Sequence, residues 1–381
     1  MQLKLPIFLI FAILTGSLAQ SNNTNGIISF LRDNNYKSLA FLLDRYPILI
    51  SLLQSNGSKT LLAPSDTAFG NLGIDDNINV TSLELQQRFA YHILNGTIRL
   101  ADFPPPGFPH LIVPTFANSS LTANNNRKQV VVLSQEEDSA RRKEIVEVQY
   151  TSYFPSNDDG SAAKDGPIFN NTVLIQQIDA VLHVPTNLSA TIPQLGIAAF
   201  EQHLDPVGLF NSTQQLNAIT LFAPSDQAFL DIDDAFSKTS AQQQRTIMAN
   251  HLINGTILYS SQLPSSTNQT AINATSASGQ NLTFTNRDGT FFVSSGNVSA
   301  KIVRSDALLD NGVIHLIDTV LFNTKLNQTA ANDASASAAN STGSASGKGS
   351  GDGKNGVTRS KIVTASALTF TALVSALLLL H

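Results

Sequence analysis

The stretch TLLAPSDTAF at residues 60–69 returns as TLFAPSDQAF at residues 220–229, with eight of ten positions identical. Each copy begins with a short apolar run, and the proline that follows it prevents a central strand from continuing. The serine and aspartate after the proline are placed to cap a short helix that carries an alanine and a phenylalanine inward. The block therefore predicts a corner from a strand into a helix, and the chain contains it twice.

Two further blocks recur in the same order. YHILNGTI at residues 91–98 returns as NHLINGTI at 250–257, and IDAVL at 178–182 returns as IDTVL at 317–321. A repeat this long indicates a duplicated domain rather than a solenoid. We predict domain 1 at residues 26–186 and domain 2 at residues 188–324. The residues predicted to form the shared structural motif are Thr60, Pro64, Asp66, Phe69, Asp179, Thr220, Pro224, Asp226, Phe229 and Asp318.

The spacing between the blocks differs in the two copies. The offset between copies is 159 at His92 and His251 but 139 at Asp179 and Asp318, so the first copy holds about 20 additional residues. These fall within residues 102–169, a span that includes the charged segment EEDSARRKEIVE. We predict an enlarged, solvent-exposed hairpin here, and a protrusion that binds a partner is the alternative.

Periodicity gives a coarse secondary structure. Leu85, Phe89 and Ile93 are four residues apart, which predicts a helix over residues 83–94, and the Asn-Gly pairs that follow at Asn95 and Asn254 predict the turn that ends it. In the second copy, alternating apolar residues on both sides of Asp288-Gly289 predict a hairpin, and two more strands follow it. Each domain is therefore predicted to be α+β, with a mostly antiparallel sheet and several helices.

The two ends of the chain are apolar. Residues 1–19 are typical of a secretory signal peptide, and the apolar run is too short for the alternative, an uncleaved membrane anchor. Residues 362–380 predict the removable tail of a glycosylphosphatidylinositol (GPI) signal, with Gly349, Ser350 and Gly351 as attachment candidates. A single membrane span is the alternative, but the basic residues lie on the wrong side of it. Residues 327–356, rich in Ser, Ala and Gly, predict a flexible stalk.

Composition narrows the chemistry. The chain has no cysteine, which excludes disulfides and thiol catalysis, and its net charge of −5 is too small to indicate a nucleic-acid partner. Fifteen Asn-x-Ser/Thr sequons are present, so a secreted chain is expected to be heavily N-glycosylated. The candidate glycosylation sites are Asn56, Asn79, Asn95, Asn118, Asn170, Asn187, Asn211, Asn254, Asn268, Asn273, Asn281 and Asn297.

The three repeated blocks resemble the fasciclin (FAS1) domain family, and the resemblance covers nearly all of the chain between the two ends. It implies tandem FAS1 domains, each a sheet wedge with several helices, and the layout is similar to that of fungal GPI-anchored cell-surface proteins. It also implies adhesion at the Tyr-His block, which gives Tyr91, His92 and His251 as candidates. Two departures are visible: Asn250 replaces the tyrosine in domain 2, and Gln176 stands where His315 does.

Catalysis is not predicted. The pairing of Ser65 and Asp66 with His92 suggests a hydrolase by residue type alone, but the chain has no Gly-x-Ser-x-Gly elbow, and the serine and aspartate stand where a helix cap is expected. No metal or other cofactor is predicted, because the seven histidines are scattered.

Two classes of function remain. The first is a non-enzymatic adhesion module that binds cell-wall or matrix glycans or proteins, or a second copy of itself, and reaches the membrane through a GPI lipid. The second is a surface carrier or sensor for a small apolar or glycan ligand. Sugar at Asn95 and Asn254 would crowd the Tyr-His blocks, so we expect the binding face elsewhere, with the 102–169 segment as a candidate.

Overall fold

The structure of the protein is a computed structural model. It describes residues 26–71, 82–105, 109–118, 128–138, 143–148, 152–153, 165–264 and 271–341. The predicted signal peptide, the GPI tail and its three attachment candidates, and the sequons at Asn79 and Asn268 lie outside these residues.

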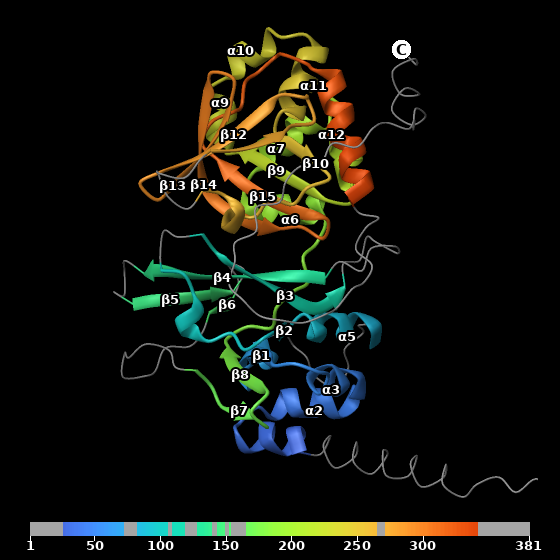
Figure 1. The fold of residues 1–381 in the computed structure, drawn as a ribbon, viewed down its shortest axis with the longest axis vertical. Coiled ribbons are helices and arrows are strands. Elements are labelled where there is room, and N and C mark those ends of the chain that lie inside the picture. Colours follow the sequence, from blue (N-terminus) through green and yellow to red (C-terminus); the bar gives the residue numbers. More distant parts are fainter. Residues whose placement is uncertain are drawn as a thin grey trace, which may run out of the picture. The chain divides into compact units, whose positions relative to one another are not determined.

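Domain 1 combines helices with a sheet of eight strands (Figure 1). Residues 26–33 are helical, and the elements that follow are α2 (Lys37–Arg45), α3 (Pro47–Leu53), β1 (Lys59–Pro64), α4 (Asp66–Asn71), α5 (Ser82–Ala90), β2 (Ile93–Asn95), η1 (Leu100–Asp102), β3 (Leu111–Asn118), β4 (Lys128–Asp138), β5 (Lys143–Val148), β6 (Ser152–Tyr153), β7 (Ile168–Phe169) and β8 (Val173–Ile178). The strand order is β6-β5-β4-β3-β2-β1-β8-β7.

Domain 2 has a sheet of seven strands in the order β10-β9-β15-β14-β13-β12-β11, in which β10 is at the edge, whereas its counterpart β2 in domain 1 pairs with β3. Its elements are α6 (Leu188–Leu195), α7 (Ala198–Leu204), α8 (Phe210–Gln214), β9 (Ile219–Pro224), α9 (Asp226–Leu230), α10 (Asp233–Ser237), α11 (Ala241–Ala249), β10 (Leu252–Asn254), η2 (Ser260–Gln262), β11 (Ile272–Thr275), β12 (Asn281–Arg287), β13 (Thr290–Ser295), β14 (Val298–Leu308), β15 (Gly312–Ile317) and α12 (Gln328–Ser341).

The predicted α+β class is confirmed. Most strand pairs are antiparallel, and in each domain the first strand pairs in parallel with the strand of the closing block, β1 with β8 and β9 with β15. The buried apolar residues form clusters that keep to one domain: residues 27–182 supply the core of domain 1, and residues 188–321 supply two clusters in domain 2. Both domains belong to one compact unit of the chain.

The corner predicted from the repeated block is present in both domains. All six residues of β1 and of β9 are buried, and each strand ends at its proline. The serine after the proline caps the helix, because Ser65 Oγ accepts a hydrogen bond from the Ala68 N–H at 3.1 Å and Ser225 Oγ accepts from Ala228 at 3.3 Å. The predicted hairpin of domain 2 is also present as β12 and β13, with positive φ at Asp288 and Gly289 in its turn.

The helix predicted over residues 83–94 is wrong at its end. Helix α5 stops at Ala90, and residues 93–95 form β2, an antiparallel partner of β1. Pairing with a buried strand satisfies the backbone of this segment and outweighs the helical spacing of its apolar residues. The Asn-Gly turn therefore ends a strand, and Gly96 and Gly255 supply its positive φ.

Two predictions concern segments with less regular sequence. In the 102–169 segment, β4 and β5 pair from Leu133–Val148 to Asp138–Lys143, so a hairpin is present within the described part of that segment. The prediction that it is solvent-exposed is wrong for the first part of β4, because Val131 and Leu133 are buried in the core of domain 1. The flexible stalk predicted from residue 327 is wrong over its first half, because residues 328–341 form α12, which packs against β10 and β11. Alanine has the highest helix propensity, and Ala331 is buried.

Candidate functional site

The aspartate of the repeated block ties two helices together. Asp66 lies in the first turn of α4, and its carboxylate accepts hydrogen bonds from the N–H groups of Lys37 and Ser38 at the start of α2, at 3.4 and 2.8 Å. Asp226 accepts in the same way from Ala199 in α7, at 2.9 Å. A carboxylate is stabilised at a helix N-terminus by unpaired N–H groups and by the helix dipole. This aspartate therefore has a structural role in both domains.

The threonine of the block fastens the chain that leaves the next strand. Thr60 Oγ1 donates to the Gly96 carbonyl at 2.9 Å and accepts from the Ile98 N–H at 2.8 Å. Thr220 makes the equivalent pair with Thr256 and Leu258. Each threonine hydroxyl therefore donates one hydrogen bond to the backbone and accepts one from it.

The two adhesion-candidate histidines are fully buried. His92 Nδ1 donates to the Arg88 carbonyl at 2.8 Å, and its Nε2 accepts from the Leu182 N–H at 3.0 Å. His251 makes the same pair of bonds with Ile247 and Leu321, at 2.9 Å each. Burial lowers the pKa of His92 to about 3 and that of His251 to about 4, so both rings are neutral at neutral pH. Neither ring offers a nitrogen to an external partner.

Tyr91 is also fully buried, and its hydroxyl donates to the Val130 carbonyl at 2.7 Å. Burial, and then the nearby Tyr259 of domain 2, raise the pKa of Tyr91 well above its ordinary value. The asparagine that replaces it in domain 2, Asn250, is buried among the hydroxyls of Ser276, Ser278 and Ser295. Direct contact of Tyr91, His92 or His251 with a partner is therefore not supported by their placement.

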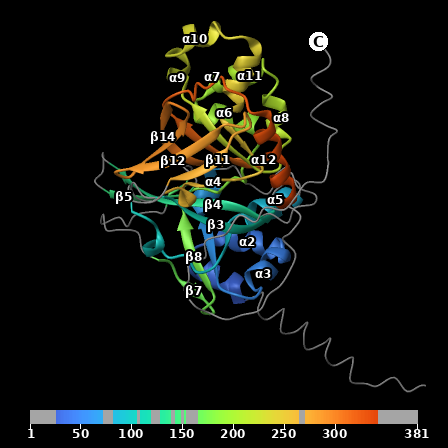
Figure 2. The same ribbon diagram turned by 45° about the horizontal axis from the view of Figure 1, so that its top comes forward.

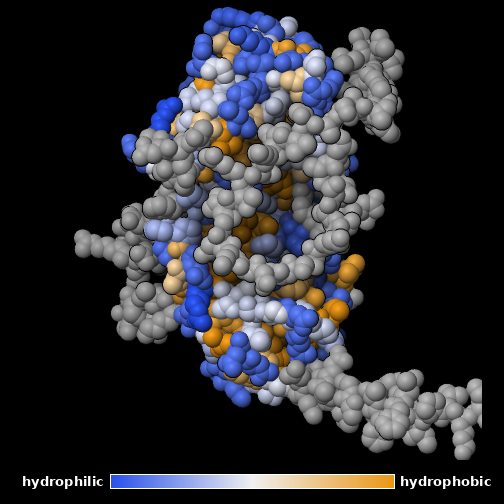
Figure 3. Space-filling view, in the orientation of Figure 1, coloured by the Kyte–Doolittle hydropathy of each residue, from blue (hydrophilic) through white to orange (hydrophobic). Residues whose placement is uncertain are grey.

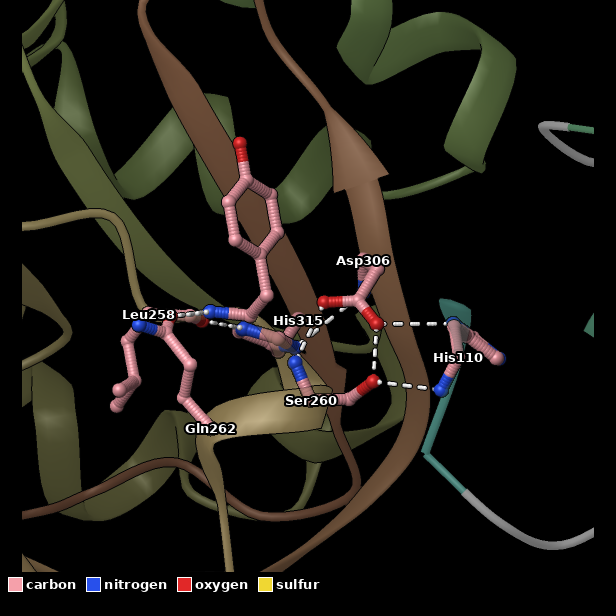
Figure 4. Close-up of polar contacts among 7 residues, drawn as sticks. His110, Leu258, Ser260, Gln262, Asp306 and His315 are labelled. Carbon is pink, nitrogen blue, oxygen red and sulfur yellow. Dashed lines mark hydrogen bonds and ion pairs between the residues drawn. The ribbon is translucent and has the colours of Figure 1, made fainter. Parts of the chain in front are cut away.

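A buried carboxylate that the sequence did not single out lies between the domains. Asp306 is fully buried and adopts a left-handed φ of 62°. Its Oδ1 accepts from the Ser260 N–H at 2.8 Å, and its Oδ2 accepts from the Ser260 hydroxyl and from His110 Nδ1, the latter at 2.8 Å (Figure 4). His110 belongs to domain 1, and its backbone N–H also donates to Ser260 Oγ, at 3.1 Å.

The ring of His315 completes this cluster. Its Nε2 donates to the Leu258 carbonyl at 2.8 Å, and its Nδ1 accepts from the Asp306 N–H at 3.3 Å, which fixes the neutral tautomer. Burial lowers the pKa of His315. Burial would raise the pKa of Asp306, but the hydrogen bonds from His110 and from the hydroxyl of Ser260 help to lower it overall.

Serine, histidine and aspartate meet here without the geometry of a hydrolase. A catalytic triad needs the serine hydroxyl bonded to the imidazole, which in turn bonds to the carboxylate. In this cluster the hydroxyl of Ser260 and the ring of His110 both bond to Asp306 instead, and Ser260 is fully buried. The arrangement stabilises a buried charge and does not activate a nucleophile.

Domain 1 contains the same carboxylate with a different partner. Asp165 accepts from the Leu100 N–H at 2.9 Å, as Asp306 does from Ser260, and from Gln176 Nε2 at 2.8 Å. Its positive partner lies in the same domain, because Arg99 Nη1 is 3.0 Å from its Oδ2. Aligning the two copies around Gln176 and His315 places Asp165 and Asp306 two residues out of register, which is why the repeat alone does not reveal the pair.

The sequons that the structure describes are mostly exposed. Nine of the candidate asparagines have exposed side chains: Asn56, Asn95, Asn118, Asn170, Asn187, Asn211, Asn273, Asn281 and Asn297. Asn254 is half-buried. No group of three histidine, aspartate or glutamate side chains suited to a metal ion occurs in the described parts of the chain.

The chain contains two copies of one α+β domain, and the polar residues that both copies share bond within their own domain. Comparison with known proteins also finds two copies. The sequence model of the Fasciclin domain family matches residues 34–152 and 196–323, more than half of the chain. The chain therefore belongs to the fasciclin family, and the predicted resemblance is confirmed.

Two fungal relatives are similar over part of their length. A "Fasciclin-like arabinogalactan protein" of Arthroderma benhamiae is 27% identical over 73% of this chain and 62% of its own. The "Fasciclin-like arabinogalactan protein CTB11" of Cercospora beticola is 26% identical over 40% of this chain and 38% of its own. The matched part is thus less than two thirds of each relative.

Among solved structures, a FAS1 domain pair from the insect cell adhesion molecule Fasciclin I is similar at 16% identity and a TM-score of 0.36, covering 82% of this chain and 99% of that one. Within residues that the structure describes, no helix is long and apolar enough to cross a membrane. Fasciclin-like relatives indicate an extracellular or cell-surface protein of adhesion type, and nothing found indicates catalysis.

Proposed function

We propose that this protein is a non-enzymatic adhesion module of the cell surface that binds cell-wall or matrix glycans or proteins, or a second copy of itself, through its tandem domains. The observation that carries the proposal is the use of the shared polar residues. Thr60, Asp66 and His92, and their counterparts in domain 2, bond to the protein's own backbone. What the two domains have in common is a scaffold, so recognition falls to exposed surface.

The exposed surface favours a polar partner. On the face drawn in Figure 3, hydrophilic residues dominate the part formed by domain 2. Among the residues that the structure describes, seven large apolar side chains are exposed, and the most exposed are Leu230 at 70%, Leu83 at 64% and Phe41 at 54%. Scattered apolar residues of this kind are normal on a soluble surface, whereas a tight hydrophobic interface needs a continuous patch. Weak polar contacts with glycans or proteins fit this surface better.

Many weak contacts made at the same time can give a high overall affinity. We propose that the C-terminal tail directs attachment of a GPI lipid, so that many copies are displayed on one cell. Linked binding modules can gain about 10² to 10⁴ in overall affinity from effective concentration alone. Two domains per chain and many chains per cell therefore support adhesion without a deep binding site.

Beads coated with the secreted protein test this mechanism. Densely coated beads are expected to aggregate or to adhere to cell-wall material, and sparsely coated beads are expected to do neither. Equal adhesion at both densities would contradict the avidity mechanism. No adhesion to any surface, together with a small molecule that co-purifies in native mass spectrometry, would favour the carrier instead.

A further inference from the structure

The two central sequons have the same sequence but different surroundings. Both read Asn-Gly-Thr-Ile, at residues 95–98 and 254–257, and both follow the short strand after the histidine. Asn95 is exposed. Asn254 is half-buried, and its Nδ2 donates to Ser335 Oγ of α12 at 3.3 Å. The element that contacts Asn254 in this way is α12.

Helix α12 is attached to domain 2 at its start. The Asn327 N–H donates to the Ser278 carbonyl at 2.9 Å, and the Asn327 side chain caps the helix by accepting from the Ala330 N–H at 3.1 Å. Gly279 allows this close approach, because a Cβ there would lie 1.9 Å from the Asn327 carbonyl oxygen. The helix then contacts β10 and β11, and Figure 2 shows α12 beside the part of the sheet that contains β11.

We propose that an N-linked sugar at Asn254 and the docked position of α12 exclude each other. The inference rests on the proposed surface location, because the sugar is added in the secretory pathway. There, Asn254 Nδ2 would attack the anomeric carbon of a lipid-linked oligosaccharide diphosphate. The carbon–oxygen bond to the diphosphate breaks, the lipid diphosphate leaves with the electron pair, and Nδ2 loses one proton.

The new bond brings the sugar ring into the space that α12 occupies. One Nδ2 hydrogen is donated to Ser335 Oγ at 3.3 Å, and the sugar would replace the other, so its anomeric carbon would lie about 1.45 Å from an amide nitrogen that contacts α12. We infer that the ring attached to that carbon competes with α12 for the space beside this half-buried amide. Asn95 is exposed among the residues that the structure describes, so we expect the same sugar to be accommodated there.

The docking of α12 is weak enough to be reversed by such a clash. Its covered face presents small side chains, with Ala331 at 6% exposure and Ala334 and Ser335 half-buried. Apolar burial contributes roughly 25 cal/mol per Å², so small side chains contribute little. Release of the 14 residues of α12 would change their span from about 21 Å as a helix to at most about 50 Å when extended. Glycosylation at Asn254 would thereby lengthen the connection between domain 2 and the C-terminus.

Hydrogen–deuterium exchange of residues 328–337, measured separately for molecules with and without sugar at Asn254, tests the exclusion. Thr256→Ala removes the sequon but keeps the Asn254 amide, and the Thr256 carbonyl that holds Thr220 is unchanged. Ala331→Glu places a charge on the covered face and undocks the helix within the full chain. Ala336→Glu is the matched control, because Ala336 is exposed on the same helix. Glycopeptide mass spectrometry gives the occupancy of Asn254 relative to Asn95.

We expect exchange in Thr256→Ala and in unglycosylated wild type to be at least about tenfold slower than in Ala331→Glu, with Ala336→Glu like wild type. Molecules with sugar at Asn254 should exchange as fast as Ala331→Glu. If wild type carries no sugar at Asn254, Ala331→Glu should raise its occupancy toward that of Asn95.

If Asn95 carries sugar, three results would overturn this inference and leave the proposed function standing. They are slow exchange in molecules glycosylated at Asn254, fast exchange in Thr256→Ala, and an Asn254 that stays unglycosylated in Ala331→Glu. Sugar on neither asparagine would contradict the secretory route, and the inference would fall with it.

Discussion

Asp165 in domain 1 and Asp306 in domain 2 occupy equivalent positions, but different groups compensate the cost of burying their charges. Both accept the first N–H of the short helix after the Asn-Gly turn. Asp165 is paired with Arg99 of its own domain, and its side chain is 27% exposed. Asp306 is fully buried and accepts from His110 of the other domain. Tyr259 occupies the position in domain 2 that matches Arg99, so the internal cation is missing there.

The difference shows how a duplicated domain becomes dependent on its neighbour. A buried carboxylate is costly unless hydrogen bonds and a positive partner compensate it. Domain 1 supplies this compensation itself, and domain 2 receives part of it from domain 1. Gln129 of β4 adds a further inter-domain bond, from its Nε2 to the Asp310 carbonyl at 3.1 Å. We therefore expect perturbations of the shared scaffold to affect the domains equally, and perturbations of this carboxylate to affect them unequally.

The largest expected effect tests whether the scaffolds are equivalent. Phe69 stacks on Phe89 with 5.8 Å between ring centroids, and Phe229 stacks on His203 at 4.1 Å. Phe69→Ala and Phe229→Ala should each lower the free energy of unfolding by about 3 to 5 kcal/mol, because truncation of a buried aromatic leaves a cavity. Urea unfolding of each full-length variant measures this. A loss in one domain only would show that the repeated block is not equally important in both.

Substitution of the carboxylates should separate the domains. Asp306→Asn keeps the shape of the side chain but removes the charge that Ser260 and His110 donate to. Hydrogen bonds to charged groups are worth about 1.5 to 3 kcal/mol each, so a loss of about 3 kcal/mol is expected. Asp165→Asn should cost about 1 kcal/mol, because water reaches its partly exposed site. Thermal unfolding of the two variants provides the comparison, and equal losses would contradict it.

Acidification should destabilise both domains through their core histidines. The folded pKa is about 3 for His92 and about 4 for His251, and the ordinary value is 6.5. Below pH 6.5 the unfolded chain therefore binds protons that the folded chain does not. Each histidine then removes about 1.4 kcal/mol of stability per pH unit, down to its folded pKa.

Urea unfolding between pH 6 and pH 4.5 isolates this effect, because the lowered pKa values of Asp165 and Asp306 keep both carboxylates ionised there. His92→Gln should reduce the slope of stability against pH for domain 1 alone, and His251→Gln for domain 2 alone. The buried His315 and the partly buried His183 remain as background in both measurements. An unchanged slope in either variant would show that its histidine is not held neutral by the fold.

The sequence correctly predicted the structural features that depend on residues close together in the chain. Ser65 and Ser225 cap their helices across three positions, and Asp288-Gly289 forms its turn locally. The domain count, the α+β class and the corner follow from such short-range patterns and from the repeat. Membership in the fasciclin family followed from the blocks themselves.

What the sequence could not predict depends on contacts between distant residues. Asp66 binds a helix 28 residues earlier, and His110 binds a carboxylate 196 residues later. Composition also misled at α12, because an alanine- and serine-rich segment has few large apolar residues to reveal that one face is covered. Burial of the Tyr-His block, likewise, is visible only once the helix and the closing strand are placed against each other.

The smallest expected effects provide the sharpest test, because they assign each partner to a domain. Arg99→Ala should lower the stability of domain 1 by about 0 to 1 kcal/mol, since Arg99 is 47% exposed. His110→Ala should lower the stability of domain 2 by about 1.5 kcal/mol, although His110 lies in domain 1. Hydrogen–deuterium exchange of peptides from β14 and from β8 reports the two domains separately. In a double-mutant cycle, His110→Ala should cost little once Asp306→Asn is present, because the bond is already lost. Additive losses, or faster exchange in β8 than in β14 for His110→Ala, would show that domain 2 does not depend on domain 1 at this carboxylate.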